Sequence, residues 1–285
     1  MPGVNSVIRK PESALRKYCR WLLAGGAASC FLVGPGCASW QRKMIYFPPA
    51  FDAAKTDELG TAAKLERWNT PSGLPLGWMR RSPVQPAEGQ VLLLHGNAGC
   101  AVWCGRYADV IQQVAALDVF IVEYPGYADR PGKPTEHNLE SSADEAFQAL
   151  PPDRRTYVLG ESLGTGVAAY LAGRYPERTD GAILLAPYSS LTDVARAHAP
   201  VLPVRTILRD RYPAADHLRY YHGPIAVLVG GADTVIPAKF GLRLYEGYSG
   251  PKRLWEFPQG DHGTVMEQPP EIWREILEFC RSNGR

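Results

Sequence analysis

The amino-acid sequence predicts an α/β fold with a mostly parallel central sheet, helices on both of its faces and a small lid-like insertion. From about residue 64 onward, runs typical of strands alternate with runs typical of amphipathic helices. Several strand-like runs, such as Val91-Leu92-Leu93-Leu94, are apolar without polar alternation, which is typical of parallel strands buried on both faces. The stretch 187–223 separates two such strands and is long enough to form a lid or a binding element.

Two antiparallel strands are expected before the parallel part of the sheet. They cover residues 63–69 and 74–79 and form a hairpin around the turn Thr70-Pro71-Ser72-Gly73. The later strands are expected at residues 90–95, 119–122, 156–159, 182–185, 225–229 and 253–257. The helices are expected at residues 103–116, 138–150, 163–175, 240–248 and 271–281. Because crossovers between parallel strands are right-handed, the loops that follow these strands meet at one edge of the sheet, where such folds bind ligands.

Length and composition indicate one folded domain behind an N-terminal extension. The chain has 285 residues, of which 45% are hydrophobic and 21% charged, and this is enough apolar mass for a single large core. We expect the domain to span residues 38–285 and the extension to span residues 1–37. The net charge is +2, and no basic stripe is interleaved with aromatic residues, so the chain lacks the electrostatic features of a nucleic-acid-binding protein.

The extension has the organisation of an export signal. A basic stretch precedes the uncharged run from Trp21 to Gly36, and small residues surround Cys37. Gly36-Cys37-Ala38-Ser39 resembles the lipobox of bacterial lipoproteins, so Cys37 is the expected lipidation site; Cys30, after Ala27-Ala28-Ser29, is a second candidate. The sequence therefore predicts an exported protein anchored to a membrane on the periplasmic side. An uncleaved anchor and a cytoplasmic protein with a buried N-terminal helix are the alternatives.

The cysteines do not indicate a metal centre. Cys100 and Cys104 have the i, i+4 spacing of half a metal site, but no second Cys or His pair lies at ligand spacing nearby. We interpret them as packed thiols. A disulfide among Cys100, Cys104 and Cys280 stays open for an oxidising compartment. No cofactor or metal is expected.

The segment Gly160-Glu161-Ser162-Leu163-Gly164 has the pattern G-x-S-x-G between a strand-like run and a helix-like run. A sharp turn from strand to helix exposes a serine hydroxyl beside a base, and it requires small residues two positions before and two positions after the serine. Ser162 is therefore the expected nucleophile. Glu161 is expected only to occupy an exposed position beside the turn. A serine in an ordinary glycine-bracketed turn is the alternative reading of the pentapeptide.

A serine nucleophile needs a base, and the base needs an acid that orients it. Asp233 and His262 both follow predicted strands, so the topology brings them to the same rim as Ser162. Asp261 is a second acid, but because it is adjacent to His262 in sequence it reaches the Nδ1 edge of that ring with difficulty, and Asp233 is preferred. Asp233 as a plain turn former beside Gly230-Gly231 is the alternative. The other histidines, expected in loop-shaping, structural or solvated positions, are His95, His137, His198, His217 and His222.

Acyl transfer also requires donors for the negative charge that develops on the carbonyl oxygen. Backbone N–H groups aimed at this oxyanion contribute on the order of 3 kcal/mol each. The N–H of Leu163, directly after the nucleophile, is the first expected donor. The second is expected from the loop His95-Gly96-Asn97-Ala98-Gly99, whose small residues let the backbone approach a substrate, and we assign it to the N–H of Asn97.

Several segments together carry a family resemblance. They are Lys43-Met44-Ile45-Tyr46-Phe47-Pro48-Pro49, Leu94-His95-Gly96-Asn97-Ala98-Gly99, Glu123-Tyr124-Pro125-Gly126-Tyr127, Gly160-Glu161-Ser162-Leu163-Gly164, Gly231-Ala232-Asp233-Thr234-Val235-Ile236-Pro237 and Gly260-Asp261-His262. Over about residues 40–282 the chain resembles the Bem46-like branch of the α/β-hydrolase superfamily, which includes bacterial lipoprotein-like hydrolases and the eukaryotic ABHD12/13/17-type lipases and depalmitoylases. It departs from that branch at Ala128-Asp129-Arg130, where the family often has Gly-x-Ser. The resemblance implies the α/β-hydrolase fold.

The residues and the resemblance together predict a serine hydrolase of the carboxylesterase and lipase class. It would cleave small-molecule carboxylic esters or thioesters through an acyl-enzyme on Ser162. Three alternatives remain. A peptidase or amidase of the acyl-peptide type would use the same residues. A haloperoxidase or dehalogenase is disfavoured, because dehalogenases have Asp at the turn where this chain has Ser162. A non-catalytic binding protein on this fold would be expected to lack one of the three residues. Apolar residues of the insertion 187–223 line an acyl pocket or pack on the sheet. The insertion also contains four arginines. They are expected either to bind an anionic head group or to face solvent: Arg196, Arg205, Arg209 and Arg211.

Overall fold

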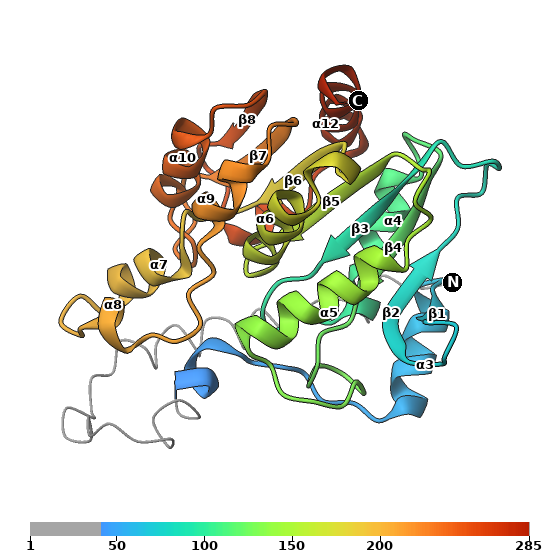
Figure 1. The fold of residues 1–285 in the computed structure, drawn as a ribbon, viewed down its shortest axis with the longest axis horizontal. Helices are drawn as coiled ribbons and strands as arrows, with labels where there is room; N and C mark the ends of the chain where they lie inside the picture. The colour runs from blue at the N-terminus through green and yellow to red at the C-terminus, as the bar shows by residue number, and fades with distance from the viewer. Residues whose placement is uncertain (1–40, 285) are drawn as a thin grey trace.

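The structure is a computed structural model that describes residues 41–284. The predicted export segment 1–37, with Cys37, therefore lies outside the described residues. The described part forms one α/β unit with a sheet between two layers of helices (Figure 1).

The central sheet has eight strands in the order β1-β2-β4-β3-β5-β6-β7-β8. They are β1 (Glu66–Asn69), β2 (Pro75–Arg80), β3 (Gly89–Leu94), β4 (Leu117–Val122), β5 (Thr156–Glu161), β6 (Gly181–Leu185), β7 (Ile225–Gly230) and β8 (Lys252–Phe257). Only the β1–β2 and β2–β4 pairs are antiparallel, which confirms the predicted hairpin and the mostly parallel sheet. Every residue of β3 to β7 is buried, as their unalternating apolar runs predict, whereas the edge strand β8 buries only Trp255.

Helices cover both faces of this sheet. α5 (Glu136–Gln148) and α6 (Gly164–Arg174) lie on one face, and α4 (Gly105–Ile111) and α12 (Pro270–Asn283) lie on the other (Figure 1). α10 (Ala238–Gly247) packs on β7. The apolar stripe of α12 is fully buried at Trp273 and Ile276, as expected for an amphipathic helix that packs on the sheet.

Two helices differ from the prediction. The helix expected at 103–116 is wrong in its bounds: a short 3-10 helix (Ala101–Cys104) precedes α4, which ends at Ile111. The chain turns there because the side-chain amide of Gln112 donates to the carbonyls of Arg81 and Leu117, both at 3.1 Å. α3 (Ala53–Ala62) was not predicted, because it buries only Thr56 and Gly60 and so has no apolar stripe.

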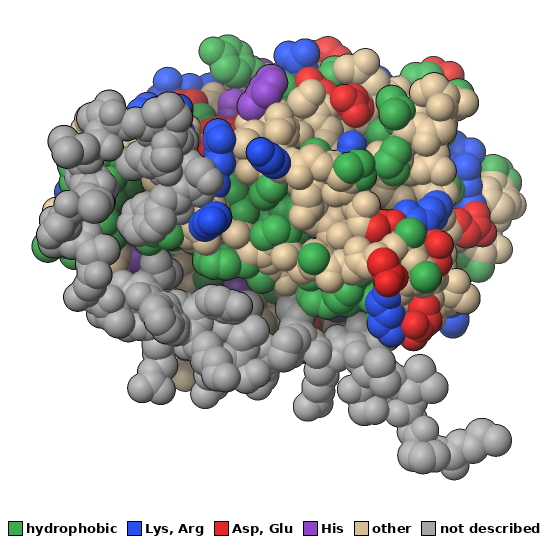
Figure 2. Space-filling model, turned by 90° about the horizontal axis from the view of Figure 1, so that it is seen from below, with side chains coloured by type: hydrophobic (Ala, Val, Ile, Leu, Met, Phe, Trp, Pro, Cys, Tyr) green, Lys and Arg blue, Asp and Glu red, His purple; other side chains and the backbone are tan. Residues whose placement is uncertain are grey.

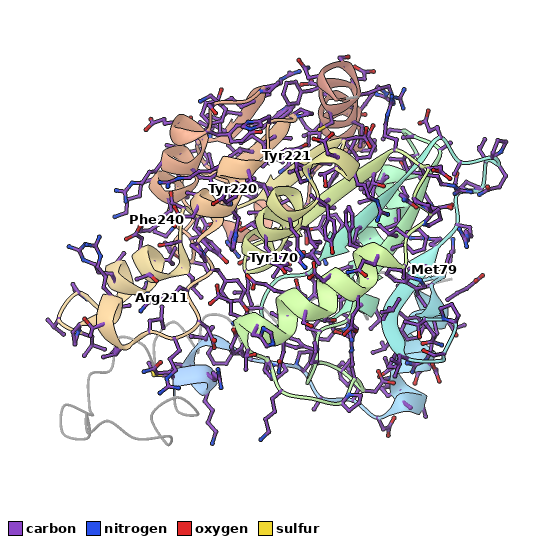
Figure 3. All side chains as sticks on the ribbon, viewed as in Figure 1. Met79, Tyr170, Arg211, Tyr220, Tyr221 and Phe240 are labelled. Atoms are coloured by element: carbon purple, nitrogen blue, oxygen red, sulfur yellow. The ribbon has the colours of Figure 1, made fainter. Side chains whose placement is uncertain are left out.

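The insertion 187–223 consists of an outer part and an inner part. The outer part contains α7 (Leu191–His198) and α8 (Val204–Ile207), and its connecting residue Val201 is 90% exposed. The inner part continues through α9 (Ala214–His217), and its buried side chains include Tyr212, Leu218 and Tyr221. Figure 3 shows Arg211 beside the outer helices α7 and α8, where its carbonyl accepts the N–H of Leu191, and Phe240 on the neighbouring helix α10. Packing on the body of the fold, one of the two expected roles of its apolar residues, is thus observed for the inner part.

Two carboxylates, half-buried Glu136 and buried Asp210, tie the insertion to the rest of the domain. Glu136, at the start of α5, accepts the backbone N–H groups of Arg211 and Tyr212 at 2.6 and 2.7 Å. Asp210 accepts Arg42 Nε at 3.1 Å and the N–H of Glu136 at 3.3 Å. Burial raises the pKa of Glu136 above its ordinary value. The point where the inner part begins is therefore held by specific polar contacts.

The described cysteines are buried thiols. Cys100, Cys104 and Cys280 form no disulfide, which answers the question that the sequence left open. Burial raises the pKa of Cys280 to about 12, so its thiol stays neutral. Among the helices of residues 41–284, none combines the length and the apolar character that crossing a bilayer requires.

Candidate active site

Ser162 occupies the turn between β5 and α6. Its φ of 53° lies in the left-handed region, which is unfavourable for a residue with a side chain. Hydrogen bonds on both sides hold it there: its N–H donates to the carbonyl of Leu185 at 2.9 Å, and its carbonyl accepts the N–H and Oγ1 of Thr165 at 3.0 and 2.6 Å. The chain thus supports the strained turn that the G-x-S-x-G pattern predicts.

The two glycines of the pattern are required by close backbone approaches. A Cβ on Gly160 would lie 2.6 Å from the carbonyl oxygen of Gly164, inside the same turn. A Cβ on Gly164 would lie only 2.1 Å from the carbonyl oxygen of Leu94, at the end of β3. Both separations are shorter than any real contact of a Cβ, so larger residues would push α6 away from the sheet.

Ser162, His262 and Asp233 form one hydrogen-bonded series. His262 Nε2 lies 3.1 Å from Ser162 Oγ, and His262 Nδ1 lies 2.6 Å from Asp233 Oδ2. His262 is the first residue of α11 (His262–Met266), and Asp233 lies in the loop after β7. The structure therefore brings together the three side chains that the sequence selected, at the rim where β5, β7 and β8 end.

The two neighbouring acids have different partners. Asp233 is buried, and its second oxygen, Oδ1, accepts the N–H groups of Val235 and Ile236, each at 2.8 Å. Asp261 is exposed and caps α11, where its Oδ1 accepts the N–H and the hydroxyl of Thr264, each at 2.9 Å. These bonds from Thr264 hold the pKa of Asp261 below its ordinary value. Asp261 thus shapes the turn that presents His262, while Asp233 contacts the ring.

Two other histidines contact the loops of the site. His95 is buried, its Nδ1 lies 2.9 Å from the carbonyl oxygen of Gly96, and its Nε2 lies 3.1 Å from Glu123 Oε1. This position agrees with the expected loop-shaping role of His95. His198, at the end of α7, contacts the carbonyl oxygen of Val235 at 3.0 Å and links the insertion to the loop of Asp233.

The backbone N–H groups of Leu163 and Asn97 are both available at this rim. Within residues 41–284, neither N–H donates to another protein group. Leu163 precedes α6, so its N–H points out of the positive end of a helix. Asn97 lies in the loop after β3, which turns through the left-handed residue Ala98. These two groups can receive a negatively charged oxygen near Ser162.

The side chain of Asn97 has a role that the sequence did not indicate. Its Oδ1 accepts the N–H groups of Phe47 and Ala98, each at 2.9 Å, and the hydroxyl of Tyr127 at 3.0 Å. Its Nδ2 donates to the carbonyl of Ile45. Three of the segments that carry the family resemblance, around residues 45, 97 and 127, therefore meet at this amide. The amide joins the loop after β3 to the start of the described chain.

Glu161 is not exposed, and the expectation that it only flanks the turn is wrong. It is 2% exposed, and its carboxylate accepts hydrogen bonds from Arg106 and Tyr107 of α4. Side chains alternate along a strand, so when Gly160 faces α6, Glu161 must face the opposite layer, where α4 lies. That alternation was the available signal for its burial.

Comparisons with known proteins agree with this architecture. The model of the alpha/beta hydrolase fold family matches residues 89–214. An uncharacterized protein of Mycobacterium tuberculosis is 33% identical over 231 residues, covering 79% of this chain and 81% of its own. An uncharacterized membrane protein of Saccharomyces cerevisiae is 30% identical over 203 residues, covering 68% and 71%. Lysophosphatidylserine lipase ABHD12 of Danio rerio is 26% identical over 280 residues, covering 81% and 72%.

A solved structure shows the same fold. Monoacylglycerol lipase of Paleococcus ferrophilus has a TM-score of 0.57 at 19% identity, and the match covers 77% of this chain and 99% of that one. Alpha/beta hydrolase domain-containing protein 17C of Xenopus tropicalis is 31% identical over 232 residues, covering 78% of this chain and 67% of its own. The chain belongs to the α/β-hydrolase superfamily, in the branch that contains this protein and ABHD12. Fold and relatives together identify it as a hydrolase.

The amide of Asn97 leads to a prediction about the segment before α3. Asn97→Ala removes the acceptor of three donors, so we expect the free energy of unfolding to fall by about 3 kcal/mol, measured by urea denaturation. Amide hydrogen exchange should quicken at Phe47 and Ala98. Asn97→Asp separates the two functions of the amide: it keeps the acceptor of Phe47 and Ala98 but sets a second carboxylate oxygen against the Ile45 carbonyl, so it should lose stability and still keep slow exchange at Phe47. Unchanged exchange at Phe47 in the alanine variant would contradict this role.

Proposed function

We propose that the chain is a serine hydrolase that cleaves carboxylic esters or thioesters through an acyl-enzyme on Ser162. The observation that carries this proposal is the series from Asp233 through His262 to Ser162, with contacts of 2.6 and 3.1 Å. It is further supported by the membership of the chain in a superfamily of hydrolases. A binding protein on this fold would not need all three side chains in contact.

The geometry translates into a two-step reaction. His262 Nε2 takes the proton of Ser162 as Oγ attacks the acyl carbonyl, and the N–H groups of Leu163 and Asn97 bind the oxyanion. His262 then protonates the leaving group and activates a water that releases the acid. Asp233 holds the ring by Nδ1 and stabilises the imidazolium, while its other oxygen is occupied by two backbone donors. All proton transfers pass through one imidazole.

For the substrate we propose an acyl ester of amphipathic shape with an anionic head group. The relative ABHD12 is a lysophosphatidylserine lipase, and lysophosphatidylserine is such a molecule. In this chain, the outer part of the insertion offers half-buried Leu202 and Ile207 beside the exposed Arg205 and Arg209. Figure 2 shows the lower face of the molecule, on which hydrophobic side chains lie among Lys and Arg side chains. Esters and thioesters are favoured over amides because their leaving groups depart with less help from proton donation by the general acid.

The nucleophile can be tested with a fluorophosphonate probe on the full-length chain. The probe should label the wild-type protein, and Ser162→Ala should abolish the label and lower hydrolysis of p-nitrophenyl acyl esters by about 10⁶-fold, the scale on which loss of such a nucleophile acts. Ser190→Ala, a change at the N-cap of α7, is a control that should keep the label. Labelling that survives in Ser162→Ala would refute the assignment. Aminoacyl p-nitroanilides, run in parallel, distinguish an esterase from a peptidase.

The two acids give a second, paired test. Asp233→Asn should lower kcat by about 10⁴-fold, because the ring loses the partner that selects its tautomer. Asp261→Asn should keep most of the activity and lower stability by about 1 kcal/mol through the weakened cap of α11. Initial rates and thermal unfolding of both variants are the measurements. The reverse order of activities would move the orienting role to Asp261.

We also propose that the N-terminus attaches the protein to a membrane through lipidated Cys37. The support is the basic stretch and the uncharged run that precede this cysteine in the sequence. In bacterial cells, the full-length chain should incorporate labelled palmitate, and globomycin should cause the unprocessed precursor to accumulate. Cys37→Ser should remove the label, whereas Cys30→Ser should not. A soluble, unlabelled product of the wild-type sequence would overturn the proposal.

A further inference from the structure

The carboxylate of Glu161 lies next to the nucleophile, and the proposed reaction does not use it. Its side chain is 3% exposed, and one oxygen, Oε2, accepts Arg106 Nη2 at 2.8 Å and the hydroxyl of Tyr107 at 2.7 Å. The same Arg106 nitrogen also donates to the Tyr107 oxygen at 3.2 Å, and a second one donates to the carbonyl of Trp103 at 3.0 Å. The three side chains form a closed network anchored below the turn.

The other carboxylate oxygen supports the loop after β3. A Cβ placed on Gly96 would lie 2.9 Å from Glu161 Oε1, 3.2 Å from the Glu161 carbonyl and 3.3 Å from Ser162 Cβ. Gly96 therefore rests directly on Glu161 and Ser162. From the other side, its carbonyl oxygen is contacted by His95 Nδ1 at 2.9 Å. Asn97, whose N–H is the proposed oxyanion donor, is the next residue.

We propose that Glu161, held by Arg106 and Tyr107, is a positioning residue that sets the distance between Ser162 and the backbone N–H of Asn97. The inference rests on the proposed serine hydrolase function. A small displacement of an oxyanion donor has a large effect on rate, because the donor must meet the oxygen where the charge develops. A buried ion pair contributes little net stability compared with apolar residues of the same volume. Stability alone therefore does not explain why the Glu161–Arg106 pair lies beside the nucleophile.

The pairing also removes an electrostatic conflict. A bare carboxylate beside Ser162 would oppose the negative charge of the oxyanion, and Arg106 neutralises it. Burial lowers the pKa of Arg106, but the neighbouring Tyr107 and Glu161 raise it by more. The pKa therefore lies above its ordinary value, and the guanidinium stays charged. Burial and then the charge of Glu161 raise the pKa of Tyr107 well above its ordinary value, so the phenol keeps the proton that it donates.

The test uses the full-length chain and p-nitrophenyl butyrate. Glu161→Gln should lower kcat about tenfold and change KM less than about twofold, because the donor shifts while the ground state binds as before. Arg106→Met should lower kcat further, because it leaves the charge of Glu161 unpaired. The double variant Glu161→Gln with Arg106→Met should be more active than Arg106→Met alone. Asp109→Asn is the control on the same helix, since that side chain is 61% exposed and pairs with Arg80 away from the turn.

Two readouts separate positioning from a merely structural role. The inhibition constant of a trifluoromethyl ketone, which forms an oxyanion with Ser162, should rise by the same factor by which kcat/KM falls. The apparent pKa of the kcat/KM profile should be unchanged, because the effect does not pass through His262. Wild-type kcat in Glu161→Gln, a double variant no better than Arg106→Met, or a shifted profile with full limiting kcat would each overturn the inference. A wild-type chain without esterase activity or fluorophosphonate labelling would instead refute the proposed function itself.

Discussion

The left-handed backbone of Ser162 is the constraint on which the rest of the site depends. A residue with a side chain in this conformation costs about 1 kcal/mol or more, and the turn persists because its neighbours hold it. Leu185 of the adjacent strand accepts its N–H, and Thr165 of α6 donates twice to its carbonyl. The same tight turn presses Gly164 against Leu94, so α6 and the end of β3 approach as closely as backbones can. The loop after β3 therefore lies beside Ser162.

Three buried carboxylates lie at Ser162 or in the loops beside it, and each has a different set of partners. Asp233 is stabilised by hydrogen bonds from two backbone N–H groups and by its contact with the ring of His262. Glu161 is neutralised by a guanidinium and a phenol. Glu123 contacts His95 through one oxygen and accepts the N–H of Ala101 through the other. If the site stabilises a developing negative charge, as proposed above, acids can lie this close only when each has local hydrogen-bond or ionic partners.

The features that could be predicted from the sequence are those with local signals. Buried parallel strands appear as apolar runs, and the loops after them contain Ser162, Asp233 and His262, so the right-handed topology brings these side chains to one rim. The helix α3 has no such signal, since only Thr56 and Gly60 are buried. The contacts of Glu161 with α4 span 55 positions along the chain, and no sequence periodicity links residues so far apart. Long-range polar partners of this kind require the three-dimensional arrangement.

The segment before α3 connects the start of the described chain to the insertion and to the loop after β3. Arg42 pairs with Asp210, and the hydroxyl of Tyr46 lies 2.8 Å from that of Tyr212, both in the insertion. One residue further on, Phe47 donates to the side chain of Asn97. The segment therefore belongs to the architecture of the site rather than to a linker, which explains why residues 43–49 share in the family resemblance. The proposed membrane attachment upstream of residue 41 would reach the site through this segment, because it contacts both the insertion and the amide of Asn97.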